Sequence, residues 1–518
     1  MGPLTRAERT NYRETSLHSD VIEFIQALKS PALQIQTVGK SHEGRDMPLL
    51  VFNAKGIFTP EAAARDKTPA VLIINNIHAG EVEGKEASLM LAREIVEGAR
   101  SDWIRGMALL ILPLFNVDGN ERISPRNRAL NLAGRDGQIG PEGGVGTRTT
   151  GEGINLNRDY MKLEAKEMRL LNEKIFYAWK PTLTVDCHTT DGSIHGFGLT
   201  YATGMNPASE AGPIDYVSKR MLPEISRRLF ERTQIRTMFY GNWLDENNPS
   251  KGWATYSHKP RYGSHYRGLT GMMDVLSETY SYLPFEERVR VNREFLVELL
   301  DFCARNIREM SSIVAAARSR TASAPSGQVP IGAELSPTGD EVEIVRRPFS
   351  VTIQDEGRTV RYTDFKQGEP EKLRTKYLGR FRPTRFVERP YGYLVPPGHD
   401  RVLETLRLHD VHFEMIDSQK LFDGSAFLIE DIQHAIEPDC GDSLRQITIV
   451  RGAWQARKIK AEAGTALIPV VQAQGNLIVY LLEPESDDSL TLWGCFDSEL
   501  RAGKPHPVLR LPRKPLET

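Results

Sequence analysis

Apolar residues follow two different spacings over the first 315 residues of the chain. Short continuous apolar runs, typical of buried strands, alternate with longer segments in which apolar residues recur at helical intervals. The expected strands cover residues 71–77, 108–115, 182–188 and 272–278, and the expected helices cover 83–97, 161–179, 214–232 and 285–313. Strands that alternate with helices predict an α/β domain whose mixed, mostly parallel sheet is flanked by helices.

The pattern changes after residue 315. Residues 315–327 are mostly small or polar and show no periodicity, which is typical of a linker. Beyond them, short segments suited to strands cover 349–353, 358–362, 446–450, 466–471 and 477–482, with one helix–strand unit at 401–416. We therefore expect a first domain over 1–315, a linker over 316–330, and a smaller β-rich or α+β accessory domain, of unknown role, over 331–518.

Composition excludes few classes of protein. The chain has 518 residues with 66 Lys and Arg against 68 Asp and Glu, a balance that gives no reason to expect nucleic acid as a partner. No apolar run approaches the roughly 18 residues of a transmembrane segment, so none is expected. The N-terminal segment lacks the apolar centre of a secretory signal. Localisation stays open: the protein would be secreted or periplasmic if a leader was removed, and cytoplasmic otherwise.

The four cysteines, Cys187, Cys303, Cys440 and Cys495, are far apart in the sequence and are expected to be buried thiols.

The first candidate for chemistry is His78-Ala-Gly-Glu81, which follows the apolar run 71–77. Ligands of open α/β sheets bind at the carboxyl ends of the strands, and the three-residue spacing lets both side chains reach one point. The motif alone has low specificity, since the chain contains a second copy, His434-Ala-Ile-Glu437. A purely structural alternative is that His78 caps the following helix and Glu81 interacts with its N-terminal dipole.

Two later strands also end in polar side chains. His188 ends the run 182–188, and Glu278 ends the run 272–278. A catalytic zinc ion takes three ligands from His, Asp or Glu and keeps one position open. His78, Glu81 and His188 supply that set, which predicts one zinc ion per chain.

Glu278 needs a partner in a buried strand, because an unpaired buried carboxylate is costly. Beside a metal it would act as the general base that takes a proton from metal-activated water. The alternative is a structural ion pair with a neighbouring arginine such as Arg261 or Arg267.

In this order along the chain, the residues resemble the zinc carboxypeptidases of the carboxypeptidase A and B type. The order is His-x-x-Glu, an Asn-Arg pair within Asn155-Leu-Asn-Arg-Asp159, a distant His and a strand-borne Glu. Further matches are Val38-Gly-Lys-Ser-His-Glu-Gly-Arg45, Asn116-Val-Asp-Gly119, and Arg148 nine residues before Asn157. The resemblance covers roughly residues 10 to 315 and implies the fold of that family.

The resemblance implies a role for each residue of the Asn-Arg pair and for Arg148. Asn157 and Arg158 would grip the terminal carboxylate of a peptide, for which a guanidinium fork is well suited. Arg148 would polarise the scissile carbonyl and stabilise the developing oxyanion. The same loop offers Arg126, Arg128 and Arg135 as rivals for that role.

The family also uses a mobile tyrosine about twenty residues before the catalytic glutamate. Tyr256 fits that spacing best, with Tyr262 and Tyr266 nearby. The implied activity is that of a zinc-dependent metallocarboxypeptidase, whose partner is a peptide with a free C-terminal carboxylate.

One departure from the family pattern affects the expected metal site. Asn155 stands where the family has an Asp that supports a zinc-bound imidazole, and an amide brings no charge to that position. Two alternatives remain at this level. One is a zinc deacylase of the aspartoacylase type acting on N-acyl amino acids. The long loop 116–153 and Arg148 favour the peptidase over this deacylase. The other is a non-catalytic peptide-binding module, although such relatives usually lose a ligand or the glutamate.

Overall fold

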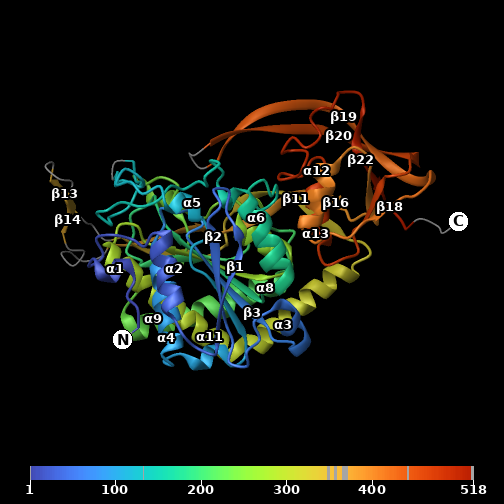
Figure 1. Cartoon of the computed structure of the whole chain (residues 1–518). Helices are drawn as coiled ribbons and strands as arrows, with labels where there is room; N and C mark the ends of the chain where they lie inside the picture. The colour runs from blue at the N-terminus through green and yellow to red at the C-terminus, as the bar shows by residue number, and fades with distance from the viewer. Residues whose placement is uncertain are drawn as a thin grey trace.

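The computed structural model describes residues 2–131, 134–346, 350–354, 359–363, 371–439 and 443–514. An eight-stranded sheet forms the centre of the first region, in the order β1-β2-β4-β3-β5-β10-β6-β7 (Figure 1). These strands are β1 (Leu33–Lys40), β2 (Asp46–Phe52), β3 (Ala70–Asn75), β4 (Ala108–Leu112), β5 (Leu183–Thr189), β6 (Leu199–Ala202), β7 (Thr237–Phe239) and β10 (Met273–Thr279). β4, β3, β5 and β10 pair in parallel, whereas β1, β2 and β6 introduce antiparallel pairs, so the predicted mixed sheet is confirmed.

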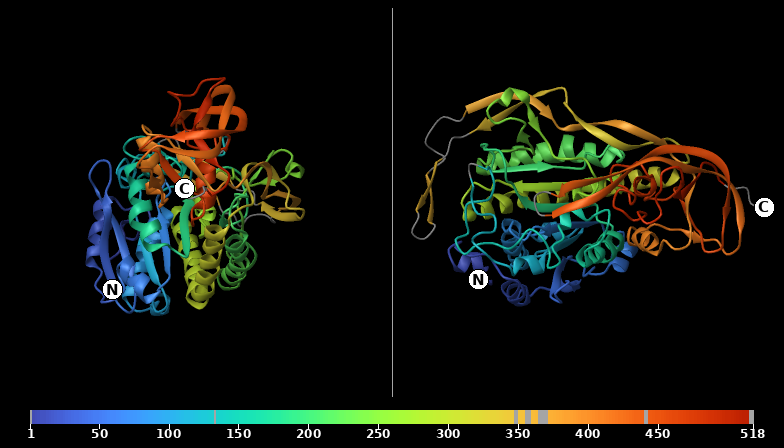
Figure 2. Two further views of the ribbon diagram at one scale, coloured as in Figure 1. Left: turned by 90° about the vertical axis from the view of Figure 1, so that its right-hand side faces the viewer. Right: turned by 90° about the horizontal axis from the view of Figure 1, so that it is seen from above.

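Helices cover both faces of this sheet (Figures 1 and 2). They are α1 (Arg6–Arg9), α2 (His18–Ala27), α3 (Pro60–Asp66), α4 (Glu83–Val96), α5 (Val117–Asn120), α6 (Lys166–Leu171), α7 (Tyr177–Trp179), α8 (Ala211–Tyr216), α9 (Leu222–Thr233), α10 (Gly263–Leu269) and α11 (Phe285–Ser323). Short 3-10 or π turns are η1 (Ser101–Ile104), η2 (Leu156–Arg158), η3 (Asn172–Phe176), η4 (Val217–Met221) and η5 (Pro249–Lys251). No described helix combines the length and apolar character needed to cross a bilayer.

The central strands β3 and β4 are almost entirely apolar because helices exclude water from both faces of the sheet. Every residue of β3 is buried. On one face α4 approaches β5 so closely that a Cβ added at Gly84 would lie 2.5 Å from Cys187 Cβ. Only glycine fits there without a shift of the helix, and the contact places the start of α4 directly beside the strand that carries His188.

The expected linker is wrong over most of its length. Instead of ending near residue 313, α11 continues to Ser323, and β11 (Gln328–Ser336) begins five residues later. Alanine has the highest helix propensity, so a small-residue segment is not in itself a linker. Ala317 and Thr321 are buried, and Arg318 donates to the Thr270 carbonyl at 2.9 Å. Helical packing therefore continues through the predicted boundary.

The C-terminal region is rich in strands, as predicted. Its elements are β11, β12 (Glu341–Arg346), β13 (Ser350–Gln354), β14 (Thr359–Thr363), β15 (Glu371–Leu378), β16 (Arg380–Glu388), β17 (Gly392–Val395), α12 (Asp400–Leu408), β18 (Glu414–Met415), β19 (Lys420–Asp439), β20 (Ser443–Ala461), β21 (Ala466–Pro469), α13 (Gly475–Leu482) and β22 (Pro505–Leu511). The predicted strand over 477–482 is wrong, because that buried run forms α13. Of the residues in the other predicted strands, Phe349 and Arg358 lie outside the described residues.

The two regions share structure. Two short strands of the first region, β8 (Asn242–Trp243) and β9 (Trp253–Ala254), join β15 and β12 in one sheet of order β12-β15-β9-β8. The largest hydrophobic cluster contains buried residues of both regions, and β19 and β20 reach back over the first region as a long hairpin (Figures 1 and 2).

Two of the described cysteines are the buried thiols that were predicted, and the third is a thiol that is only partly buried. Cys187 and Cys303 are buried, Cys495 is half-buried, and all three are free. Cys440 lies outside the described residues.

Candidate active site

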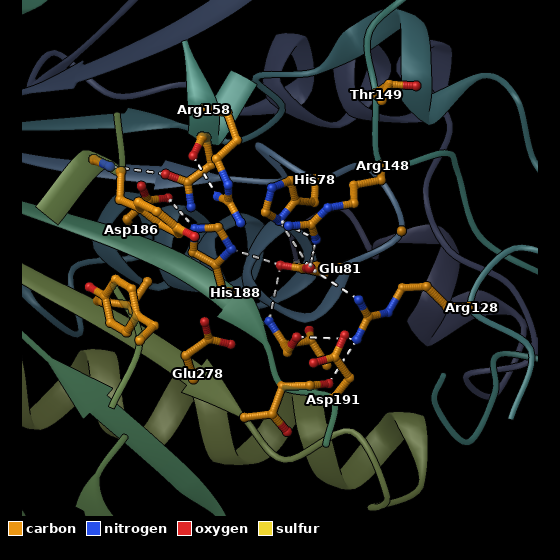
Figure 3. A pocket seen from close by; sticks show the side chains of 18 of the residues that line it. His78, Glu81, Arg128, Arg148, Thr149, Arg158, Asp186, His188, Asp191 and Glu278 are labelled. Atoms are coloured by element: carbon orange, nitrogen blue, oxygen red, sulfur yellow. Dashed lines mark hydrogen bonds and ion pairs between the residues drawn. The ribbon is translucent and has the colours of Figure 1, made fainter. Parts of the chain in front are cut away.

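A pocket of about 750 Å³ lies at the carboxyl ends of β3, β5 and β10 (Figure 3). All eight residues predicted for the site line it: His78, Glu81, Arg148, Asn157, Arg158, His188, Tyr256 and Glu278. They come from segments that are up to 200 positions apart, counting from His78 to Glu278. The chain order noted in the sequence therefore corresponds to one place in the fold.

The turn that presents His78 and Glu81 depends on Asn76. This residue has a φ of 63°, in the left-handed region that asparagine tolerates better than most residues. Its Nδ2 donates to the carbonyl oxygens of His78, Ala79 and Glu81 at 3.4, 3.2 and 3.1 Å. One side-chain amide thus satisfies three carbonyls of the tight turn and fixes the direction of both candidate ligands.

The Glu81 carboxylate bridges the two histidine rings (Figure 3). Its Oε1 is 3.0 Å from His78 Nδ1, and its Oε2 is 2.8 Å from His188 Nδ1. One ligand atom from each residue lies within 4.8 Å of the others, and the described residues contain one such group of three. Two imidazole nitrogens and a carboxylate oxygen, all buried, are a donor set that suits zinc.

The outer nitrogen of each histidine also has a partner. Asn155 Oδ1 lies 3.1 Å from His78 Nε2. Asn155 therefore stands where the resemblance places the family's aspartate. Asp186 Oδ1 lies 3.2 Å from His188 Nε2, and Arg267 Nη2 donates to Asp186 Oδ2 at 3.1 Å. Such partners fix the ring orientation, so both Nδ1 atoms face the shared point.

Asp186 was missed in the sequence. Its signal is spacing: it stands two residues before His188 on β5, and alternate residues of a strand point to the same face.

We expect Asp186→Asn to weaken zinc binding by about tenfold to hundredfold, which is the usual effect of removing a side chain that supports a metal ligand. Competition with a chelator measures this. An unchanged zinc affinity would show that His188 is oriented by its other contacts alone.

Burial and charge in the cluster favour the metal-binding form of two of the three candidate ligands, Glu81 and His78. Burial raises the pKa of Glu81, but His78 and His188 outweigh it and hold that pKa well below its usual range. Burial, followed by the charge of Arg148, lowers the pKa of His78 to about 3. Burial lowers the pKa of His188, but the negative charges of Asp186 and Glu81 outweigh burial and raise this pKa to about 10. Because metals bind deprotonated ligands, Glu81 and His78 are already suited at neutral pH.

Two arginines reach the cluster from the long loop. Arg148 Nη1 lies 3.1 Å from His78 Nδ1 and 3.3 Å from Glu81 Oε1. Arg128 Nη1 donates to Glu81 Oε1 at 3.1 Å, while its Nη2 donates to the carbonyls of Thr189 and Thr190. Arg128 thus ties a candidate ligand to the end of β5. The remaining rivals, Arg126 and Arg135, do not line the pocket.

Asn157 and Arg158 enter the pocket from η2. Asn157 Oδ1 accepts a hydrogen bond from the Gly263 amide at 3.0 Å, and the Arg158 guanidinium lies 3.8 Å above the centre of the Tyr262 ring. A cation held over an aromatic face is attracted by the ring's quadrupole. The pair therefore rests on the start of α10, on the opposite side of the metal ligands from Arg128 (Figure 3).

Glu278 stands directly beside His188, because the parallel register of β10 and β5 pairs these two residues. It forms no hydrogen bond or ion pair with any described residue. The alternative ion pair is wrong: Arg267 contacts Asp186 and Asp274, and Arg261 contacts residues of the C-terminal region. Burial raises the pKa of Glu278 to about 8. The charges of Glu81 and Asp191 also raise this pKa, whereas His188 and Arg128 lower it.

The tyrosines near residue 260 occupy different places. Tyr256 lines the pocket and stacks on His265, with ring centres 4.9 Å apart. Tyr262 supports Arg158, whereas Tyr266 is buried and its hydroxyl contacts Tyr177 and His409. Tyr256 is thus one of two tyrosines from this segment that line the pocket, and its role in substrate binding stays a prediction.

The second His-x-x-Glu motif is not a metal site. His434 and Glu437 lie on β19, where residues three apart point to opposite faces. His434 Nδ1 is 3.1 Å from Thr448 Oγ1, and Glu437 pairs with Lys259 and Arg261. The same motif therefore has different consequences on a turn and on a strand.

The fold and the pocket define an α/β protein with a zinc-type donor set, two neighbouring arginines and an uncommitted carboxylate. The family profile described as "Zinc carboxypeptidase" matches residues 19–176. This segment, which carries His78, Glu81, Arg148, Asn157 and Arg158, matches the zinc carboxypeptidase family, as the resemblance predicted.

Curated relatives match a similar length of the chain. Mouse carboxypeptidase D is 30% identical over 165 residues, which is 29% of this chain and 11% of that protein. Human carboxypeptidase D is 30% identical over 169 residues, 29% of this chain and 12% of that protein. The chain thus matches about a tenth of the length of these relatives.

Solved structures with similarity to the chain include several carboxypeptidases, two of which serve as examples. A metallo-carboxypeptidase from Burkholderia cenocepacia gives a TM-score of 0.38 at 16% identity, covering 56% of this chain and 69% of its own. Carboxypeptidase A from Helicoverpa armigera gives a TM-score of 0.39 at 15% identity, covering 59% of this chain and 75% of its own.

Proposed function

We propose that the protein is a zinc-dependent metallocarboxypeptidase that removes a C-terminal residue from peptides. The observation that supports this most is the meeting, in one pocket, of a zinc-type donor set with an Asn-Arg pair on one side and a free carboxylate beside His188. The family of residues 19–176 points to the same chemistry. An exopeptidase needs both parts, because one holds the chain end and the other cleaves the adjacent bond.

His78, Glu81 and His188 would hold the zinc ion. The donor atoms fit zinc in number and type, and Asn155 and Asp186 hold both rings with Nδ1 toward the shared point. Bound zinc would supply positive charge that polarises a carbonyl and lowers the pKa of water.

The protein's own residues would do the rest. Arg158 can bind a carboxylate through two parallel hydrogen bonds, and Tyr262 and Gly263 hold the Asn157–Arg158 pair in place for this. Arg148, at the edge of the ligand cluster, would donate to the scissile carbonyl oxygen as negative charge develops there. Glu278, which has no competing partner among the described residues, would take the proton from water and give it to the leaving nitrogen.

Amidation of the substrate's C-terminus tests this proposal. Cleavage of an N-blocked dipeptide should fall by at least about a hundredfold when its terminal carboxylate becomes a carboxamide, because charge-assisted bidentate bonds to Arg158 are lost. The values of kcat/KM for the acid and the amide measure this. An N-acyl amino acid serves as the comparison substrate. Equal cleavage of acid and amide would reject the carboxypeptidase, and preference for the N-acyl amino acid would favour the deacylase.

A further inference from the structure

The C-terminal region grips the segment that carries Tyr256 and Tyr262. Trp253 and Ala254 of β9 pair in parallel with Tyr377 and Leu378 of β15, and the Thr255 amide extends this pairing by donating to the Leu378 carbonyl at 3.0 Å. The segment therefore leaves the first region, passes along a strand of the second, and returns to line the pocket.

The C-terminal region makes its most extensive polar contacts with Arg261, which is buried and precedes Tyr262. Its backbone amide donates to Asp488 Oδ2 at 2.6 Å, and its Nε donates to Asp488 Oδ1 at 3.0 Å. Its Nη1 lies 2.8 Å from Glu437 Oε1, which Lys259 Nζ also reaches at 2.8 Å. Two cations of the loop thus meet two anions of the C-terminal region. Because Asp488 is fully buried, removing its charge would leave Arg261 poorly compensated.

Trp493 joins this cluster to the Asn-Arg pair. The Arg261 guanidinium lies 4.4 Å from the centre of its ring, and Lys162 Nζ lies 4.1 Å from the same ring. The indole Nε1 donates to Asp488 Oδ1 at 2.9 Å. Lys162 Nζ in turn donates to the Arg158 carbonyl at 3.1 Å. The C-terminal region therefore reaches Arg158 by two routes, through Tyr262 and through Lys162.

We propose that Asp488, Glu437 and Trp493 are positioning residues for the subsite that binds the terminal carboxylate. They act through Arg261 and Lys162, which hold Tyr262 and the backbone of Arg158, and the inference rests on the proposed carboxypeptidase function. The accessory region is then part of the substrate site. These three residues do not line the pocket, so they would contribute to binding of the chain end only through the residues that they hold.

The test compares Asp488→Asn and Glu437→Gln with the unaltered protein, in the zinc-loaded full chain. Both variants keep the shape of the side chain and remove one charge. We expect KM for the free-acid dipeptide to rise roughly tenfold for Asp488→Asn and less for Glu437→Gln, because small displacements of a binding group are costly. The kcat value should change by less than about threefold, and zinc content should stay whole. Cleavage of the amidated dipeptide should be unchanged, so the preference for the acid falls.

Asp423→Asn is the matched control. Asp423 lies on β19 like Glu437 and pairs with Lys458, but both side chains are exposed and the pair is remote from the loop. This variant should behave like the unaltered protein. If Asp488→Asn does not fold, Glu437→Gln decides, because Glu437 is only half-buried.

The outcomes separate the inference from the proposed function. If the unaltered protein prefers the acid and both folded variants keep its KM and preference, the inference is rejected and the carboxypeptidase stands. Loss of zinc together with kcat would also reject it, because the residues would then support the metal site. An unaltered protein that does not prefer the acid overturns both.

Discussion

We expect turnover to fall by at least about a hundredfold, and up to about ten-thousandfold, when Glu278 is replaced by glutamine, while zinc remains bound. This range is typical of losing a general base. Glutamine keeps the length and hydrogen-bonding reach of the side chain but cannot accept the proton. Glu278 lies next to His188 in the strand register, yet it is not one of the three grouped ligands. KM should change little, because Asn157 and Arg158 lie elsewhere in the pocket.

Steady-state kinetics and elemental analysis of the purified variant provide the measurements. Zinc lost together with activity would identify Glu278 as a ligand. Activity within about tenfold of the unaltered protein would assign the base to another group.

The second large effect is expected at the metal ligands. His188→Ala should remove zinc from the purified protein and lower turnover by at least roughly a thousandfold, since a catalytic metal contributes several kcal/mol to the transition state. His78→Ala and Glu81→Ala should do the same. The loss of zinc affinity should exceed the tenfold to hundredfold expected for Asp186→Asn, because a ligand is removed and not only its support.

The chain offers its own control for this experiment. His434 belongs to the second His-x-x-Glu motif but contacts Thr448 on a paired strand. His434→Ala should retain full zinc and full activity. If zinc stayed bound in all three ligand variants, or if His434→Ala removed the zinc, the metal centre would have to be placed elsewhere.

The sequence predicted the elements that carry the chemistry because their signals are local. β3 is a continuous apolar run, whereas polar residues interrupt the apolar residues of β5 and β10. All three end in a polar residue, and each forms the strand expected, within two residues at its C-terminal end. The same kind of signal failed for α13. The apolar run 477–482 has six buried residues and no polar face, and periodicity cannot distinguish a helix from a strand in that case.

The contacts that complete the site could not be predicted in this way. Arg128 was one of several arginines in a glycine-rich loop, and only the fold shows that its guanidinium reaches Glu81. Asp488 lies more than 200 positions from Arg261, and no spacing rule connects them. The end of α11 was also missed, because buried Ala317 and Thr321 stabilise a helix whose composition is typical of a linker.

The sheet of order β12-β15-β9-β8 has a consequence for how the protein loses its structure. Strands from both regions depend on one another for their hydrogen bonds, and α11 runs unbroken toward the junction between the regions. Unfolding of the C-terminal region would expose β9 and release the segment from Tyr256 to Tyr262. The C-terminal region and this segment therefore lose their structure together, and partial denaturation should abolish recognition of the chain end before it disturbs the metal ligands, which lie at the ends of the central strands.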